Sequence, residues 1–244
     1  MIHYNIHWFE SLHSTQDYLK NSFDDSLPKW TVFVAKEQIK GKGQGQNVWE
    51  SEKDKNLTFS ILLYPNFLQA RDQFLITQIL SLGIYDFLSH YLSNVFIKWP
   101  NDIYVGKNKI CGILVQNQII GMEYSTAFCG IGLNVNQTEF SFAPNPTSLK
   151  LELDRSFDLD ILLEEVLDCI RIRYEQLENN LIADYKKEYM EKLLFYKVWS
   201  KYLYCDNEIM EAKIKDVDNF GRLILENRGG KEIIADLKQL KFLF

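Results

Sequence analysis

Four runs of strand-forming residues follow one another in the middle of the chain, at residues 95–99, 103–105, 109–120 and 126–135. Residues 106–108, with the sequence Gly-Lys-Asn, are typical of a tight turn between two of these runs. A helical pattern of apolar residues precedes the group, and another follows it. Because a sheet has to bury its apolar face against a second layer, this order predicts an α+β fold with helices packed on a sheet.

The helices are predicted from apolar residues that recur with helical spacing. The first long helix spans about residues 69–92, and the second is capped by Asp158 and continues to about residue 177. Ser14 is an expected N-cap of a short helix that ends near residue 22, and a further helix is expected at about 181–194. The other strands predicted in this part of the chain lie at residues 2–9, 31–37 and 57–63.

The tail of the chain has a different pattern. Residues 197–244 consist of short strand-like runs broken by turn sequences at 205–207, 218–221 and 227–230. Several short strands at this spacing predict a small β-barrel. We therefore expect two domains, a catalytic domain at residues 1–194 and a small C-terminal β-barrel at residues 195–244.

Charge and hydropathy exclude several classes of partner. The chain has 244 residues and a formal net charge of −6, from 27 basic and 33 acidic side chains. A nucleic acid-binding protein normally carries a basic surface, so no nucleic acid partner is expected. The sequence contains no run of about 18 apolar residues, and its N-terminal segment lacks a basic stretch followed by an apolar one, so no membrane contact and no signal peptide are expected. The expected location is cytoplasmic.

The sequence offers no metal-binding motif. The four cysteines are widely spaced and form no CxxC pair, which favours reduced, mostly buried thiols. His3 and His7 alternate with apolar residues in a strand-like segment. This spacing places both imidazoles on the polar face of a strand, and we predict no metal site there.

Residues 38–56 form a polar segment without periodicity, which is long for a simple connection and therefore a candidate functional loop. Its three glycines within residues 41–45 fit neither the P-loop frame nor a GxGxxG turn that opens a helix. They allow backbone amides to approach a ligand, and Lys42 adds a positive charge. A flexible surface loop is the simpler interpretation. Trp49 is either a stacking face for a planar ligand or an anchor in the core.

Three further segments place polar residues or glycines at strands. Residues 101–102, Asn and Asp, follow a strand that ends at a proline, and they either face a site or form a turn. Lys109 begins an apolar strand and either neutralises a phosphate or carboxylate or protects a strand edge. Gly112 within this strand, and Gly130 and Gly132 in the next, indicate close approach by a ligand or tight packing of sheets.

No Ser-His-Asp or Cys-His set is recognisable in the sequence. The Ser14–Thr15 pair is by default a helix cap, although a helix N-terminus also offers donors to a polar ligand. Without a nucleophile set or a metal cluster, the predicted chemistry is electrostatic, a transfer assisted by backbone amides and lysines.

Taken together, these segments resemble the biotin–protein ligase family in order and spacing. The resemblance is closest over residues 10–136 and rests on five segments: residues 14–16, 38–49, 98–102, 109–115 and 130–134. A Lys-Trp-Pro-Asn-Asp motif followed by a K-x-x-G-I-L strand, behind a G-[RK]-G loop, is quite specific to this family. It implies a mixed-sheet, class II synthetase-like catalytic domain packed with helices and a small C-terminal SH3-like barrel.

The resemblance also implies a reaction in two steps. The carboxylate of biotin attacks the α-phosphate of ATP, which gives biotinyl-5′-AMP and pyrophosphate. A lysine of a biotin carboxyl carrier domain, part of a biotin-dependent carboxylase such as acetyl-CoA carboxylase, then takes the biotinyl group and releases AMP. Charge accumulates on one phosphorus, so lysines, backbone amides and Mg²⁺ suit the chemistry.

The family's functional positions carry over residue by residue. Biotin is expected to contact residues with small or hydrogen-bonding side chains or a nearby charge: Ser14, Thr15, Gln16, Gln38, Gly41, Lys42, Gly43, Gln44, Lys109, Gly112, Gly130 and Gly132. ATP is expected to contact Trp49, Asn101, Lys109, Ile131 and Asn134. The implied catalytic residues are Lys109, which bridges the biotin carboxylate and the α-phosphate, Lys42, and Asp102, which orients or deprotonates the acceptor lysine.

Two departures from the family pattern matter. Many members have the loop sequence G-R-G-R with further arginines, whereas this chain has Lys42, Gln44 and Asn47. Lysine keeps the charge without the bidentate fork, and Gln44 loses the charge, so we expect the loop to hold the adenylate mainly through backbone amides. Some members also carry an N-terminal DNA-binding domain. The motifs begin here at Ser14, which together with the acidic charge predicts the ligase-only type.

Three alternatives stay open at this point. A lipoate or octanoate ligase shares the fold and the adenylate chemistry but needs a long apolar tunnel for its acid. A catalytically silent biotin- or nucleotide-binding module would keep the pocket without turnover. An aromatic-rich β protein that binds sugars or another protein would show no affinity for nucleotides. The sequence also leaves open whether the protein forms a homodimer.

Overall fold

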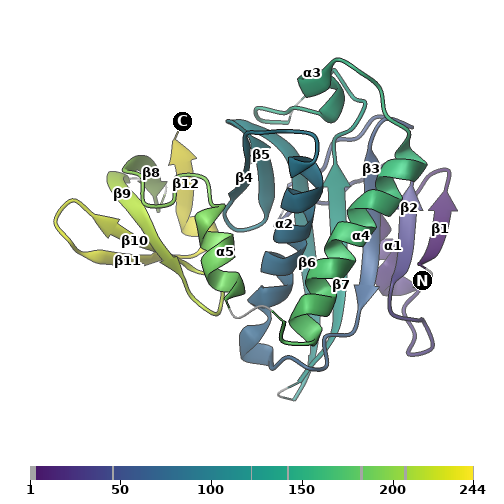
Figure 1. Ribbon diagram of the computed structural model, residues 1–244, viewed down its shortest axis with the longest axis horizontal. Helices are drawn as coiled ribbons and strands as arrows, with labels where there is room; N and C mark the ends of the chain where they lie inside the picture. The colour runs from purple at the N-terminus through teal and green to yellow at the C-terminus, as the bar shows by residue number, and fades with distance from the viewer. Residues whose placement is uncertain are drawn as a thin grey trace.

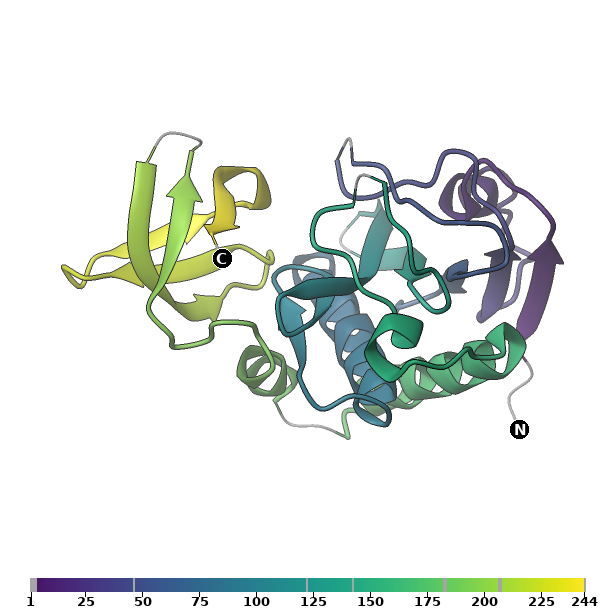
Figure 2. The ribbon, with the colours of Figure 1, turned by 90° about the horizontal axis from the view of Figure 1, so that it is seen from above.

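Two β-sheets organise the structure, a computed structural model that describes residues 4–45, 47–121, 123–141, 143–181, 184–205 and 208–243. A seven-stranded sheet forms the centre of the larger unit, and a five-stranded sheet forms the smaller one (Figure 1). Viewed from above in Figure 2, the smaller unit lies to one side of the larger and holds the C-terminus.

The larger sheet has the strand order β1-β2-β3-β7-β6-β5-β4. Strands β1 and β2 pair in parallel and the other neighbours are antiparallel, so the sheet is mixed. The four consecutive runs predicted in the middle of the chain form adjacent strands because short turns bring each strand back beside the previous one. The strands are β1 (Asn5–Phe9), β2 (Thr31–Ala35), β3 (Leu57–Leu63), β4 (Val95–Lys98), β5 (Asp102–Val105), β6 (Asn108–Ile120) and β7 (Glu123–Leu133).

Helices cover both faces of this sheet. The two long helices, α2 (Phe74–Ser89) and α4 (Leu159–Glu178), lie side by side on one face, and α1 (Thr15–Asn21) lies on the other (Figure 1). The main apolar core fills the space under α2 and α4. A small second cluster under α1 contains Leu19, Phe33, Leu62 and Phe128. Strand β3 is therefore buried along its whole length, which explains its nearly continuous apolar sequence.

The predicted helix starts are confirmed by their caps. The Ser14 hydroxyl accepts from the backbone N–H of Asp17, and the Asp158 carboxylate accepts from the first turn of α4. The predicted helix at 69–92 is instead a 3₁₀ turn, η1 (Ala70–Asp72), followed by α2. Helix α3 (Leu149–Leu153) was not predicted because five residues are too few to show a period. Helix α5 (Tyr185–Glu191) covers part of the predicted 181–194, of which residues 182–183 lie outside the described residues.

The smaller unit confirms the predicted series of short strands. They pair antiparallel in the order β11-β10-β9-β8-β12, from one edge of the sheet to the other. The predicted turns at 218–221 and 227–230 join β9 to β10 and β10 to β11, whereas residues 206–207 of the third predicted turn lie outside the described residues. The elements are β8 (Ser200–Tyr204), β9 (Glu208–Val217), β10 (Leu223–Asn227), β11 (Glu232–Ala235), η2 (Leu237–Gln239) and β12 (Leu240–Leu243).

Polar bonds join the smaller unit to the larger one. The indole N–H of Trp99, just after β4, donates to the backbone carbonyl of Gly221 at 2.8 Å. The Lys186 ammonium in α5 pairs with the Asp216 carboxylate in β9 at 2.7 Å. These bonds hold the five-stranded sheet beside the β4–β5 end of the larger sheet.

Arg173 ties three helices together and carries a stability prediction. Its guanidinium, in α4, lies 2.9 Å from the Asp86 carboxylate in α2 and 2.7 Å from the Glu188 carboxylate in α5, and its side chain is 12% exposed. Arg173→Met leaves two half-buried carboxylates without their partner, so we expect a loss of about 2 kcal/mol in the free energy of unfolding. Urea denaturation measures this loss.

Arg171 provides the matched control for that experiment. Its guanidinium pairs with Asp168 and Glu175 of the same helix, and its one bond outside the helix is to the neutral hydroxyl of Tyr4 at 3.0 Å, so its ion pairs join no separate elements. We expect Arg171→Met to cost less than about 1 kcal/mol. Equal losses for the two variants would contradict the assignment of Arg173 as an inter-helix tie.

Candidate active site

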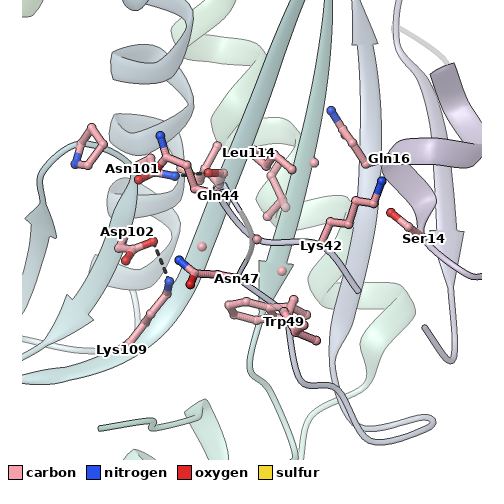
Figure 3. Close-up of a pocket in the computed structure, with 18 of the residues that line it drawn as sticks. Ser14, Gln16, Lys42, Gln44, Asn47, Trp49, Asn101, Asp102, Lys109 and Leu114 are labelled. Atoms are coloured by element: carbon pink, nitrogen blue, oxygen red, sulfur yellow. Dashed lines mark hydrogen bonds and ion pairs between the residues drawn. The ribbon is translucent and has the colours of Figure 1, made fainter. Parts of the chain in front are cut away.

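A cavity of about 270 Å³ opens on the sheet face that carries α1 (Figure 3). Five segments form its walls: the start of α1, the glycine-rich loop, the β4–β5 turn, the paired strands β6 and β7, and η2 of the smaller unit. We call it the first cavity. It contains the following predicted site residues: Ser14, Thr15, Gln16, Gln38, Lys42, Gly43, Gln44, Trp49, Asn101, Asp102, Lys109, Gly112, Gly130, Ile131 and Gly132.

Two rows of residues across the sheet explain why these positions meet. In one row Lys98, Asp102, Gly112 and Gly132 are direct cross-strand neighbours from β4 to β7. Paired residues in a sheet point to the same face, so this row faces the cavity together. A second row, two residues further along, contains Ser60, Gly130 and Leu114. The spacing of two between the glycines therefore places both on one face.

Lys109 reaches the same face through an irregularity in the sheet. It precedes Gly112 by three residues, so regular alternation would point its side chain to the opposite face. The pairing of β5 with β6 shifts register between Ile103 and Tyr104, which is a β-bulge. Bulges re-aim side chains, and they often do so beside functional sites. Here the bulge brings the Lys109 ammonium to 2.7 Å from the Asp102 carboxylate.

Hydrogen bonds fix the floor of the first cavity. The backbone N–H and the hydroxyl of Thr15 both donate to Gln38 Oε1, at 2.8 and 3.2 Å. The Ser60 hydroxyl lies 2.9 Å from Thr15 Oγ1 and 3.1 Å from Gln16 Oε1, and Gln16 Nε2 donates to the Phe128 carbonyl. These mutual bonds hold the polar groups in one arrangement and form a preorganised polar surface.

Two glycines of β7 make room for side chains of the site. A Cβ atom on Gly130 would lie 2.7 Å from Gln16 Oε1, and a Cβ atom on Gly132 would lie 2.3 Å from Cε2 of Trp49. The Trp49 indole thus lies directly against the backbone of Gly132 (Figure 3 shows its position). Its N–H is buried and, within the described residues, has no hydrogen-bond partner.

The glycine-rich loop folds back on itself and is tied to α1. Gly43 N–H donates to the Asn47 carbonyl, and Trp49 N–H donates to the Gly41 carbonyl. The Lys42 ammonium pairs with the Asp17 carboxylate at 2.7 Å and points toward the start of α1 (Figure 3). Both side chains are partly exposed, so this pair contributes little to stability but sets the position of the loop.

A second cavity of about 550 Å³ adjoins the first. Trp49, Lys98, Asp102 and Lys109 line both cavities and form a shared wall. The second cavity also contains Asn134, whose Nδ2 donates to the Thr147 carbonyl while its buried Oδ1 has no partner within the described residues. An unsatisfied buried acceptor is costly, so Asn134 keeps its place at some expense in stability.

Two of the predicted site residues, Asn134 and Gly41, do not line the first cavity. Asn134 lines the second cavity, and Gly41 lines neither of the two but packs against Trp49 and Gln38. The Asn101 amide donates to the Ile113 carbonyl, so it supports the turn after β4 as well as lining the first cavity.

Sequence reasoning missed Lys98, Ser60 and Leu237. Lys98 lines both cavities, and burial lowers its pKa, although the nearby Asp102 charge acts in the opposite direction. Lys98 ends the strand before the Asn-Asp pair, so its side chain lies on the same face of the sheet as that of Asp102. This position was the signal that could have identified it. Leu237 reaches the first cavity from the smaller unit, and no sequence pattern indicates that contact.

The cysteines lie near the site without reactive character. Cys111 and Cys129, in β6 and β7, are buried free thiols, and burial raises the pKa of each well above its usual range. Cys169 is half-buried and Cys205 is exposed, so the prediction of buried thiols holds for the first two. A raised pKa keeps the thiolate fraction low, so neither buried cysteine is a nucleophile.

Neither a metal centre nor a membrane span is found in the part of the chain that the structure describes. Its His, Cys, Asp and Glu side chains form no group of three or more that could hold a metal ion. His7 is exposed with its ring edge-on to Phe33, and His3 lies outside the described residues. No helix in the same ranges is both long and apolar enough to cross a bilayer.

Comparison with known proteins relates the chain to ligases. The family model described as the biotin/lipoate A/B protein ligase family matches residues 8–134. The chain is 27% identical over 244 residues to the bifunctional ligase/repressor BirA of Bacillus subtilis (strain 168), across 93% of this chain and 71% of that protein. It is 28% identical over 220 residues to the chloroplastic biotin–protein ligase 1 of Arabidopsis thaliana, across 86% of this chain and only 56% of that relative.

The likeness extends to solved structures and to both units of the chain. The biotin protein ligase from Aquifex aeolicus, in complex with biotin and ATP, matches with a TM-score of 0.79 and 25% sequence identity. The match covers 98% of this chain and 99% of that one.

Proposed function

The chain belongs to the biotin/lipoate A/B protein ligase family, and on that premise we propose that it catalyses the ATP-dependent biotinylation of a protein through biotinyl-5′-AMP. The single observation that carries this proposal is the pair of adjoining cavities that share Lys109, Asp102, Lys98 and Trp49. An acid in the first cavity and a nucleotide in the second meet at this wall, where the cations are placed.

In the first step, the carboxylate oxygen of biotin forms a bond to the α-phosphorus of ATP, and the bond from that phosphorus to the bridging oxygen of pyrophosphate breaks. The Lys109 ammonium neutralises the charge that develops between the two reactants, because it lies on the shared wall. When the anionic reactants bind, the Lys109 ammonium exchanges its ion pair with Asp102 for contacts with them. The glycine-rich loop excludes water from the mixed anhydride.

The polar floor recognises the acid. Thr15, Gln16, Gln38 and Ser14 present hydrogen-bonding groups that suit the ureido ring of biotin. A ureido ring offers two N–H donors and a carbonyl acceptor to these groups, whereas the apolar part of a lipoyl or octanoyl chain offers no hydrogen-bonding group. The floor therefore favours biotin over the acids of the related ligases.

Trp49 and Asn134 recognise the nucleotide. The indole offers a flat face beside the second cavity, and Asn134 contacts the nucleotide from the wall of that cavity. Ile131 and Asn101 line the first cavity, and we assign them to the part of the nucleotide that lies next to biotin.

In the second step, the ε-amine of an acceptor lysine attacks the acyl carbon of biotinyl-5′-AMP, loses a proton, and AMP leaves. Asp102, freed from Lys109, orients this amine and takes its proton. We propose that the acceptor belongs to a biotin carboxyl carrier domain of a carboxylase such as acetyl-CoA carboxylase.

We propose that Mg²⁺ binds together with ATP, on its phosphates. The described residues supply no cluster of three carboxylates or imidazoles to hold it, so the ion would be bound chiefly by phosphate oxygens and water. It would supply charge neutralisation when present. The need for ATP and the four free cysteines fit a cytoplasmic protein.

We further propose that residues 195–244 form an SH3-like barrel domain distinct from the catalytic domain at 1–194. The antiparallel order of five short strands, with η2 before the last one, supports this assignment. Its contribution of Leu237 to the first cavity indicates a part in shaping the site. The net charge of −6 supports ligase activity without DNA binding.

Gln44 tests how the loop holds the adenylate. It lines the first cavity near Asn101 (Figure 3), where many family members have arginine. An arginine adds a charge-assisted hydrogen bond to the phosphate, so we expect Gln44→Arg to slow release of biotinyl-5′-AMP by about tenfold. A pulse-chase with labelled biotin measures the rate. An unchanged off-rate would contradict the view that this loop relies mainly on backbone amides.

The proposed function is tested by transfer of biotin to a carrier domain. Purified protein is incubated with biotin, ATP and a biotin carboxyl carrier domain, and the carrier is examined by mass spectrometry. We expect one biotinyl group on the carrier lysine and none on a carrier whose lysine is replaced by arginine. Modification of neither carrier, with intact ATP binding, would favour a silent binding module.

A further inference from the structure

Lys98 differs from the other lysines of the cavities in its partners. Lys42 is paired with Asp17, and Lys109 is paired with Asp102. Within the described ranges, no carboxylate lies within ion-pair distance of the Lys98 ammonium. Its neighbours are two aromatic rings, with Nζ at 5.3 Å from the ring centre of Tyr104 and 5.2 Å from that of Phe242.

The position of Lys98 is set by both units of the molecule. It is the last residue of β4 and the cross-strand neighbour of Asp102. Tyr104 belongs to β5, whereas Phe242 belongs to β12 of the smaller unit, where its ring packs edge-on against Tyr202 at 5.1 Å. The smaller unit therefore holds the ammonium away from bulk water, and burial lowers the pKa of Lys98.

A third cavity of about 370 Å³ starts at this lysine. Lys98, Tyr104 and Pro144 line both the second and the third cavity, and Phe242 and Lys241 form the far side of the third one. Lys98 is thus the lysine that reaches all three cavities. The Asp102 carboxylate acts on Lys98 through its charge but forms its ion pair with Lys109. A cation held between aromatic rings without an ion-pair contact of its own is suited to bind an anion that arrives with the substrate.

We propose that Lys98 binds the β- and γ-phosphates of ATP and then the pyrophosphate that leaves, with the third cavity as its exit. This inference rests on the proposed function. In phosphoryl transfer the attacking and leaving oxygens lie roughly in line, so the leaving group points away from the acid in the first cavity. Lys109 neutralises the α-phosphate, and Lys98 neutralises the charge that moves onto the leaving oxygen.

The test separates the two half-reactions because only the first involves pyrophosphate. Three variants are compared with the wild type: Lys98→Met, which keeps an apolar stem between the rings, Lys98→Arg, which keeps the charge, and Lys107→Met. Lys107 is an exposed residue of the β5–β6 turn, so its replacement makes the same change in charge away from the cavities.

Two assays are made on each variant. Biotin-dependent ATP–pyrophosphate exchange gives the KM for inorganic pyrophosphate, and transfer from added biotinyl-5′-AMP to a carrier domain gives the rate of the second step.

We expect Lys98→Met to raise the KM for pyrophosphate by about tenfold or more, as for loss of one charge-assisted hydrogen bond. The rate of the transfer step should fall by a much smaller factor, and Lys98→Arg should restore most of the affinity for pyrophosphate. Lys107→Met should match the wild type.

Two results would overturn the inference. One is an unchanged KM for pyrophosphate in Lys98→Met. The other is an equal loss in both half-reactions that arginine does not rescue, which would assign Lys98 to the packing of the two units. Absence of exchange in the wild type would instead show that the proposed function has failed, and the role of Lys98 would fall with it.

Discussion

Replacement of Lys109 by alanine should lower the rate of biotin-dependent ATP–pyrophosphate exchange by about 10²–10³-fold, the usual cost of removing one preorganised group that stabilises transition-state charge. Lys109 is placed on the wall that the first and second cavities share, and its ammonium lies 2.7 Å from Asp102. The bulge in β5–β6 aims it there. The measurement is incorporation of labelled pyrophosphate into ATP at saturating biotin.

The control for Lys109 is the neighbouring exposed lysine of the same hairpin. Lys107→Ala changes the charge equally but lies in the turn outside the cavities, so exchange should stay within about twofold of the wild type. Loss of the Lys109 ammonium also leaves Asp102 unpaired, so Asp102→Asn combined with Lys109→Ala separates the two effects. Recovery of wild-type exchange in the double variant would mean that Lys109 only neutralises Asp102.

Gly132→Ala should raise the KM for ATP by about 10–100-fold. The new Cβ atom would lie 2.3 Å from Cε2 and 2.7 Å from Nε1 of Trp49, so the indole has to leave its place on β7. Displacement removes the stacking face beside the second cavity, and lost aromatic packing together with overpacking costs about 1–3 kcal/mol. Steady-state kinetics with ATP as the varied substrate measure the change.

Gly130→Ala is the matched variant on the same strand and the same face. Its Cβ would lie 2.7 Å from Gln16 Oε1, on the floor of the first cavity. We expect it to raise the KM for biotin more than the KM for ATP, the reverse of Gly132→Ala. If both variants affect the two substrates in the same ratio, the division of the site into an acid cavity and a nucleotide cavity is wrong.

Most helices and strands could be predicted because each of them is marked by a signal in neighbouring residues of the sequence. Helix caps at Ser14 and Asp158, apolar periodicity in α2 and α4, and turns between short strands are all local features that the structure confirms. Helix α3 is too short for such a signal. The order of strands in the larger sheet depends on pairing over long distances along the chain, such as that of β3 with β7, and this pairing leaves no local pattern.

The site residues that belong to a motif of consecutive residues could be predicted from the sequence. The site residues that folding brings in from distant parts of the chain could not. The glycines and lysines of the motifs share the first cavity. The reason the glycines are needed is visible only in three dimensions, since they admit Trp49 and Gln16. Ser60 and Leu237 come from distant strands or from the smaller unit, so the chain positions near the motifs give no indication of them.

The central claim is that the two adjoining cavities activate biotin with ATP, and acid-dependent ATP–pyrophosphate exchange tests it most directly. The wild-type protein is assayed in parallel with biotin, lipoate and octanoate. We predict exchange with biotin alone, because the fixed polar floor matches a ureido ring and not an acyl chain. Exchange with lipoate or octanoate in place of biotin would contradict the assignment of the floor, and exchange with none of the acids, despite bound ATP, would contradict the assignment of an adenylating enzyme.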